Sequence, residues 1–279
     1  MSDYPLLEVE SQVTQQNDTT FTINLPESFA FGTVPNGGFI SAVFLRVASQ
    51  YLASSNQPDT FAANWHFLNA TYVGPAVLVV EEARKGRALS IIHITLYQEG
   101  ILSQSPWISE KSKKKIVAYI ANNRIEAEGG LTLSTSYQLR ETPPPVDLVK
   151  LADDRDMNWE RLRMIFMDMA PLMQHVEFYS PKNKTASPAC WDVWFRMSNG
   201  ERWKTWMLSY LADMTPALVI EGFRPTDFDA PTPKDRFAFD KIYWLPTVSL
   251  SLDVKKALPK DGEEWLRVRI EAKVIKNGS

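Results

Sequence analysis

The feature that most constrains the fold is an order of elements that occurs twice, once on each side of a proline-rich segment. In the first half, a strand pattern at 20–25 precedes an apolar stretch at 39–52 whose residues recur at helical spacing. In the second half, a strand pattern at 191–197 precedes an apolar helical stretch at 203–221. Strand-like runs follow each helical stretch. A chain that repeats this order is expected to fold as two similar units.

The strand-like runs after each helical stretch are rich in β-branched and aromatic residues. They lie at 61–72, 77–83, 89–97 and 115–122 in the first half, and at 246–255 and 265–274 in the second. Either the second unit lacks its last two strands, or the natural protein continues beyond this sequence. A unit that lacks two strands has an unpaired sheet edge, which proteins usually cover. We therefore expect a homo-oligomer or the linker to cover it. We also expect strands 61–72 and 247–256 to be paired or adjacent in a joined sheet.

The two halves are separated by a segment with the composition of a linker. It contains a Gly-Gly pair and three successive prolines, and it has few apolar residues. We therefore predict an N-terminal unit at 1–126, a linker at 127–150 and a C-terminal unit at 151–279.

Composition narrows the functional classes. The formal net charge of -3 does not show the excess of basic residues that is typical of nucleic-acid-binding proteins. The single cysteine, Cys190, rules out an intramolecular disulfide framework and fits a reducing compartment. The three histidines are not spaced as metal ligands, and no run resembles a signal peptide, a membrane span or a C-terminal peroxisomal signal. We expect a cytoplasmic protein that binds no metal, nucleic acid or membrane.

One acid, Asp213, lies inside the apolar run at 205–220. Burying a carboxylate is costly unless the group is paired, hydrogen-bonded or protonated. A structural interpretation is that Asp213 closes the turn before Pro216, because the residue before a proline disfavours the helical region. A catalytic interpretation is that it serves as a base. The local pattern leaves both interpretations open.

Five segments carry a resemblance to a known family. The sequence VPNGGFISAVFLRV at 34–47 resembles a glycine-led central helix, and WMLSYLADMTPAL at 206–218 resembles a second one. The surrounding strands are matched by WHFLNATYVGP at 65–75, RKGRALSIIHITLYQEG at 84–100 and PTVSLSLDVKKALP at 246–259. Together they resemble the type II acyl-CoA thioesterases, in the thioesterase-like branch common in fungi. The resemblance implies an α+β double hotdog, with two long central helices that are each wrapped by a curved antiparallel sheet.

The resemblance also implies roles for particular residues. Members of the family hydrolyse acyl-CoA with an Asp on the second central helix, a Ser or Thr on the next strand, and a Gln near the end of the last strands. Asp213 matches the acid, and Ser249 matches the hydroxyl, with Thr247 and Ser251 as neighbours on the same face. The Gln has no counterpart in this sequence.

Two further groups are candidates for binding substrate. Asn36, Gly37 and Gly38 precede or open the first helix, where backbone N–H groups carry roughly half a positive charge and can bind an oxyanion. The structural interpretation of the two glycines is a turn with tight helix packing. By analogy with the family, Arg84 and Arg87 at the hairpin turn are candidates for the phosphates of CoA.

Three functional hypotheses remain. The first is a thioester hydrolase that uses an Asp-activated water without metal or organic cofactor. The second is a repurposed enzyme of fungal secondary metabolism, a cyclase, dehydratase or isomerase that acts on a polyketide-like ligand. The third is a non-catalytic acyl-ligand binder. Release of free thiol from acyl-CoA would favour the first hypothesis. Turnover without thiol release would favour the second, and stabilisation by a ligand without any product would favour the third.

Overall fold

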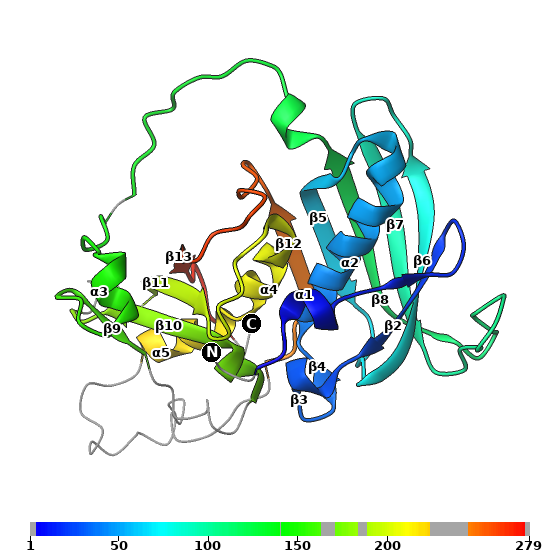
Figure 1. Cartoon of the computed structure of the whole chain (residues 1–279), viewed down its shortest axis with the longest axis horizontal. Coiled ribbons are helices and arrows are strands. Elements are labelled where there is room, and N and C mark those ends of the chain that lie inside the picture. Colours follow the sequence, from blue (N-terminus) through cyan, green and yellow to red (C-terminus); the bar gives the residue numbers. More distant parts are fainter. Residues whose placement is uncertain (1–3, 140, 163–170, 184–188, 224–244, 277–279) are drawn as a thin grey trace.

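The computed structural model describes residues 4–139, 141–162, 171–183, 189–223 and 245–276, which form antiparallel sheets packed on helices (Figure 1). The larger sheet has seven strands in the order β1-β2-β6-β7-β8-β5-β12. Their bounds are β1 Thr14–Gln15, β2 Thr20–Leu25, β5 Asp59–Phe67, β6 Gly74–Arg84, β7 Ser90–Gln98, β8 Lys113–Asn123 and β12 Ser249–Asp253. The strand patterns expected between residues 20 and 122 are thereby confirmed, with small differences at their ends.

The long helix α2, Gly37–Leu52, lies against this sheet (Figure 1). Its side chains are buried on most sides, including Phe39, Val43 and Phe44, which are fully inaccessible. A helix that is apolar nearly all round is stable only inside a core. The sheet and the second half of the chain together provide that core, so the helix expected at 39–52 is confirmed as the centre of the first unit.

The smaller sheet belongs to the second half of the chain. Its order is β13-β11-β10-β9, with β9 Trp159–Arg161, β10 Val176–Pro181, β11 Cys190–Met197 and β13 Leu266–Glu271. The strand patterns at 191–197 and 265–274 are confirmed, whereas β9 and β10 were not expected. Strand β10 is buried on both faces, so its sequence lacks the alternation that marks a half-exposed strand.

The prediction of a second long central helix is wrong. The chain from 205 to 222 forms a 3₁₀ turn at Thr205–Met207, helix α4 at Leu208–Asp213 and helix α5 at Pro216–Gly222. Pro216 has no backbone N–H and disfavours the helical region for Thr215, so the helix is interrupted there. The Thr215 hydroxyl donates to the carbonyl oxygen of Ala212 at 2.6 Å, which satisfies one acceptor at the break.

The remaining elements are short. Helices α1 and α3 span Leu7–Glu10 and Leu148–Ala152, and β3 Ala30–Phe31 pairs with β4 Val34–Pro35. Single 3₁₀ turns lie at Glu27–Phe29, Ala53–Ser55, Ile125–Ala127 and Pro171–His175. No described helix is both long enough and apolar enough to cross a membrane.

Strand β12 joins the two halves of the chain. It pairs antiparallel with β5, so that Ser249 lies opposite His66 and Asp253 opposite Ala62. The pairing expected between 61–72 and 247–256 is therefore confirmed. Because Leu250 packs against the main core, the C-terminal half extends both the sheet and the core of the N-terminal half.

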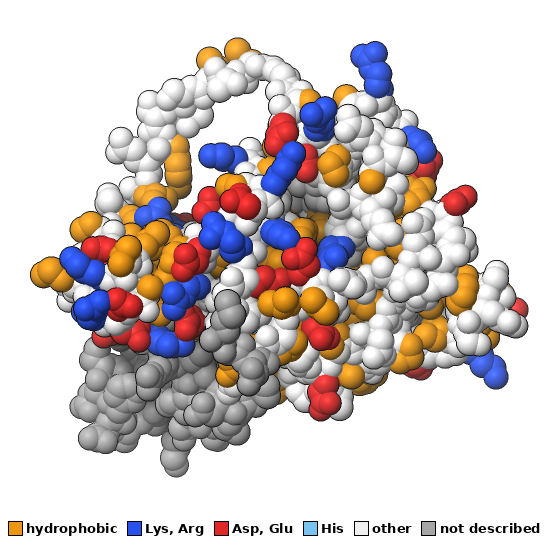
Figure 2. All heavy atoms as spheres, in the orientation of Figure 1, with side chains coloured by type: hydrophobic (Ala, Val, Ile, Leu, Met, Phe, Trp, Pro, Cys, Tyr) orange, Lys and Arg blue, Asp and Glu red, His pale blue; other side chains and the backbone are white. Residues whose placement is uncertain are grey.

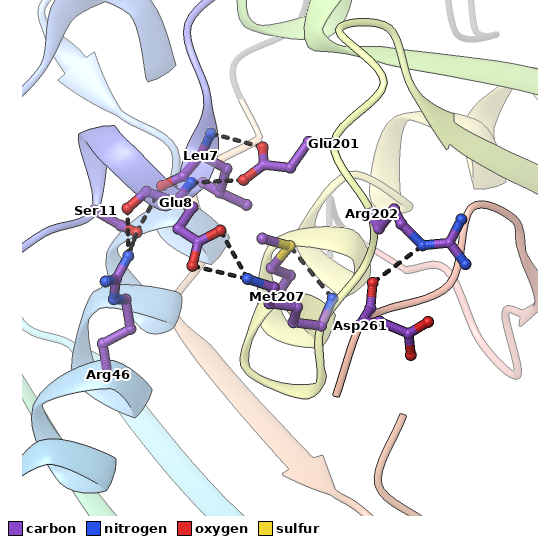
Figure 3. Close-up of polar contacts among 9 residues, drawn as sticks. Leu7, Glu8, Ser11, Arg46, Glu201, Arg202, Met207 and Asp261 are labelled. Carbon is purple, nitrogen blue, oxygen red and sulfur yellow. Dashed lines mark hydrogen bonds and ion pairs between the residues drawn. The ribbon is translucent and has the colours of Figure 1, made fainter. Parts of the chain in front are cut away.

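The N-terminal segment forms hydrogen bonds with both halves of the chain (Figure 3). The carboxylate of Glu201 accepts the backbone N–H groups of Leu7 and Glu8, each at 2.8 Å. Arg46, from α2, donates to the Glu8 carbonyl and to the Ser11 hydroxyl. Burial raises the pKa of Glu201, an effect that the two N–H donors oppose. Helix α1 thus bridges α2 and the loop that precedes α4.

The linker has two structurally different parts. Residues 129–139 have no regular secondary structure and arch away from the body of the protein (Figures 1 and 2). The part near α3 packs on the outer face of the smaller sheet, where Leu151 joins Trp159, Tyr179 and Trp265 in a second apolar cluster. The indole N–H of Trp159 donates to the Pro145 carbonyl at 3.2 Å, which ties this part of the linker to β9.

Candidate active site

The carboxylate of Asp213, at the end of α4, meets three hydrogen-bond donors. Its Oδ2 accepts the backbone N–H of Gly38 at 2.8 Å and the side-chain amide of Asn36 at 2.9 Å. Its Oδ1 accepts the hydroxyl of Thr247 at 2.6 Å. The three donors come from the start of α2 and from the segment before β12. The half-buried carboxylate is therefore well satisfied, which offsets the cost of removing it from water.

The N-terminal end of α2 stabilises this carboxylate. Asn36 is the N-cap residue, and its side-chain oxygen accepts the N–H of Phe39 at 2.8 Å while its amide reaches Asp213. The N-terminal end of a helix carries roughly half a positive charge, which favours an anion at this position. Asn36 therefore couples the helix cap to the orientation of the acid.

The two glycines have different surroundings. A Cβ atom on Gly38 would lie 2.5 Å from the Cβ of Asp213 and 2.6 Å from the Ser209 carbonyl oxygen, so α2 and α4 approach closely only with glycine there. A Cβ atom on Gly37 would lie 3.2 Å from the Phe67 ring and 3.3 Å from Asp213 Oδ2. The N–H of Gly38 donates to Asp213, whereas the N–H of Gly37 has no hydrogen-bond partner among the described residues.

Of the three candidate hydroxyls, Thr247 is the one that contacts Asp213. Ser249 is exposed at the start of β12, and no hydrogen bond links it to Asp213 in the described part of the chain. Ser251 accepts the side-chain amide of Asn64 at 2.6 Å. The alternation of a strand places these hydroxyls on one face, but the sequence alone does not indicate which of them reaches the acid.

The two candidate phosphate-binding arginines lie far from this site. Arg84 and Arg87 are exposed at the turn between β6 and β7. Gln57, which follows α2, donates to the carbonyls of Gly86 and Arg87. The turn is therefore at the C-terminal end of α2, whereas Asp213 is at its N-terminal end. Since α2 has 16 residues, the two ends are about 24 Å apart.

The acceptor geometry indicates what the site can do chemically. A carboxylate offers about four lone-pair positions, two on each oxygen. Two donors meet Oδ2 and one meets Oδ1, so the position left open is on Oδ1, beside Thr247. A water that donates there would have a base within reach. No group of three or more His, Cys, Asp or Glu side chains that could hold a metal is found among the described residues.

Comparison with solved structures identifies the fold. A protein from Thermobifida fusca described as a thioesterase II has a TM-score of 0.64 and 17% identity, over 97% of this chain and 88% of that one. A thioesterase structure from Novosphingobium aromaticivorans has a TM-score of 0.63 and 16% identity, over 95% of this chain and 87% of that one. A hotdog-fold protein from Alicyclobacillus acidocaldarius has a TM-score of 0.57 and 17% identity, over 78% and 73% of the respective chains. The chain thus has a hotdog fold.

Comparison of sequences identifies the family. Residues 25–119 match the model of the acyl-CoA thioesterase N-terminal domain, and residues 145–279 match that of the C-terminal domain. The thioesterase-like protein TwmA of Talaromyces wortmannii is 32% identical over 292 residues, which cover 96% of this chain and 83% of the relative. With matches to both domain models and to this relative, the chain belongs to the acyl-CoA thioesterase family.

Proposed function

We propose that this protein hydrolyses an acyl-CoA thioester and that Asp213 is its general base. The supporting observation is the Asp213 carboxylate, which is fixed by Asn36, Gly38 and Thr247 and has one acceptor position left on Oδ1. A base must lie within hydrogen-bond reach of the water that it activates, and its orientation must be fixed. The membership of the chain in the acyl-CoA thioesterase family supports the same reaction class.

The reaction proceeds in two steps. The oxygen of a water molecule attacks the thioester carbonyl carbon while Asp213 Oδ1 accepts a proton from that water. The oxyanion that forms is stabilised by the N–H of Gly37 at the positive end of α2. The tetrahedral intermediate then collapses, the carbon–sulfur bond breaks, and the thiolate of CoA leaves and takes up the proton. The products are a carboxylic acid and free CoA.

The other candidate residues have supporting roles in this proposal. Thr247 orients Asp213 through its hydroxyl, and Ser249 and Ser251 lie on the strand that follows, where they border the substrate. Arg84 and Arg87 bind the phosphates of CoA. A long pantetheine arm separates these phosphates from the thioester, which accords with the length of α2 between the arginines and Asp213.

Assaying a panel of acyl-CoA thioesters with a thiol-reactive dye tests the proposal. We expect thiol release by the native protein, and loss of that release in Asp213→Asn with an unchanged melting temperature. A cyclised or conjugated product without thiol release would instead identify a repurposed enzyme that acts on a polyketide-like thioester. A raised melting temperature with ligand and no product would identify an acyl-ligand binder.

A further inference from the structure

The side chain of Phe67, at the end of β5, lies beside the candidate active site. A Cβ atom built on Gly37 would lie 3.2 Å from both Cε1 and Cζ of the Phe67 ring, and 3.3 Å from Oδ2 of Asp213. These two ring atoms are at the outer end of the side chain, so the tip of the ring faces the first residue of α2. Phe67 and Asp213 therefore flank the same glycine, although they come from different halves of the chain.

The position of this ring is set by the larger sheet. Strand β5 stands between β8 and β12 (Figure 1), where Phe67 pairs with the fully buried Ile116 and donates its backbone N–H to the Val248 carbonyl at 3.0 Å. Val248 directly follows Thr247, whose hydroxyl donates to Asp213. The contact between β5 and the start of β12 therefore fixes both the ring of Phe67 and the hydroxyl partner of the acid.

Phe67 is the accessible end of a buried row of side chains on β5. Ala63 and Trp65 share its face of the strand, because side chains alternate between the two faces. They are 6% and 0% exposed, whereas Phe67 is half-buried. Trp65 thus fills the space next to Phe67 in this row. A half-buried aromatic ring beside polar groups is typical of the lining of a small-molecule site.

Gly37 leaves room for a ligand between the ring and the acid, because it has no side chain. Its backbone N–H has no hydrogen-bond partner among the described residues. A carbonyl oxygen that accepts this N–H lies about 3 Å from the nitrogen. The carbon atoms attached to that carbonyl then lie close to the tip of the Phe67 ring, which touches the same residue.

We propose that Phe67 is a specificity-determining residue, whose ring excludes acyl groups that carry a branch on the carbon next to the thioester carbonyl. This role of Phe67 rests on the proposed function, in which the carbonyl oxygen accepts the N–H of Gly37. An unbranched acyl group presents a methylene group to the ring at van der Waals distance, whereas a methyl branch on the same carbon overlaps with the ring. The substrates are therefore straight-chain acyl thioesters.

Thiol release from straight and branched acyl-CoA thioesters tests the inference. The substrates are butyryl-CoA and octanoyl-CoA, each compared with its α-methyl derivative. A pocket discriminates by about 10–200-fold for one carbon group, so Phe67→Ala should raise the ratio of kcat/KM, branched over straight, by about 10-fold or more. Phe67→Leu keeps more of the packing and should give an intermediate ratio. The matched control, Tyr119→Ala, removes an exposed ring from the opposite face of the same sheet and should leave the ratio unchanged.

The ratio separates selection from a structural role. If Phe67 only supports the fold, its loss lowers kcat/KM for both members of a pair by the same factor. An unchanged ratio in a folded Phe67→Ala variant would overturn the inference, while thiol release by the native protein would still support the proposed hydrolysis.

Binding of unreactive analogues supplies a measurement that does not depend on turnover. In the ketone analogues of these acyl-CoAs a methylene group replaces the sulfur, so the carbonyl is kept but cannot be hydrolysed. We expect the branched analogue to raise the melting temperature of the native protein less than the straight one, and the two to act equally on Phe67→Ala. This pattern without any thiol release would contradict the proposed hydrolysis and still support selection by Phe67. Equal stabilisation of the native protein by the two analogues, or none by either, would overturn the inference.

Discussion

The backbone N–H of Gly38 donates to the Oδ2 of Asp213 at 2.8 Å, across 175 residues of sequence. This bond joins the N-terminus of α2 in the first unit to the end of α4 in the second. It places the acid of one unit at the positive end of the helix of the other. The candidate active site therefore exists only because the two units pack helix against helix.

Replacing Gly38 with alanine should disrupt this packing. The new Cβ would lie 2.5 Å from the Cβ of Asp213 and 2.8 Å from the Cα of Tyr210, so α2 and α4 must separate. Overpacking of this kind costs about 1–3 kcal/mol, and we expect the free energy of unfolding to fall by that amount. Gly129→Ala is the matched control, because a Cβ atom on Gly129 would have no neighbour within 4 Å. Equal stability of the two variants in urea titrations would contradict the packing role of Gly38.

Thr247 and Ser249 should differ in their effect on turnover. Thr247→Val keeps the shape of the side chain but removes the hydroxyl that donates to Asp213, and hydrogen bonds to charged groups contribute about 1.5–3 kcal/mol. We expect kcat to fall by about 10-fold or more, and Thr247→Ser to restore most of it. Ser249→Ala should change kcat less, because Ser249 is exposed. A larger loss in Ser249→Ala would assign the hydroxyl role to Ser249.

The arginines at the hairpin turn should affect only the CoA part of the substrate. The double variant Arg84→Ala/Arg87→Ala should raise KM for an acyl-CoA by about 3–10-fold, since exposed charge pairs contribute little each. The control is a short acyl thioester that lacks the nucleotide, whose kcat/KM should not change. An unchanged KM for acyl-CoA would place the phosphates elsewhere on the protein.

His175 should make stability dependent on pH. Burial lowers its pKa, an effect that the bond from its Nε2 to the Ser28 carbonyl only partly opposes. Below the ordinary histidine pKa of about 6.5, the unfolded chain therefore binds a proton that the native state does not. The free energy of unfolding should thus fall as pH decreases from about 7.5 to about 5.5. This fall should be smaller in His175→Gln, as measured by urea titration at each pH. An equal fall in the native protein and in the variant would contradict the prediction.

Much of the fold could be predicted from the sequence, because strand and helix patterns depend on local alternation. The pairing of β12 with β5 was predictable from the repeat, but β10 was missed because burial on both faces removes its alternation. A turn before Pro216 was one of the two interpretations of Asp213, but the apolar spacing at 203–221 predicted a single helix, which the structure divides into α4 and α5. The contacts of Asp213 with Asn36 and Thr247 depend on how the two units pack, which the sequence does not encode locally.

The most direct test of the account is the turnover of Asp213→Asn. An asparagine can still accept from Asn36 and Gly38 and can meet the Thr247 hydroxyl as a donor, so the fold should be kept while the base is lost. We expect kcat for thiol release from an acyl-CoA to fall on the order of 100-fold or more, with an unchanged melting temperature. Full turnover in a folded Asp213→Asn variant would contradict the catalytic role, and unfolding of the variant would show that the acid is a structural partner.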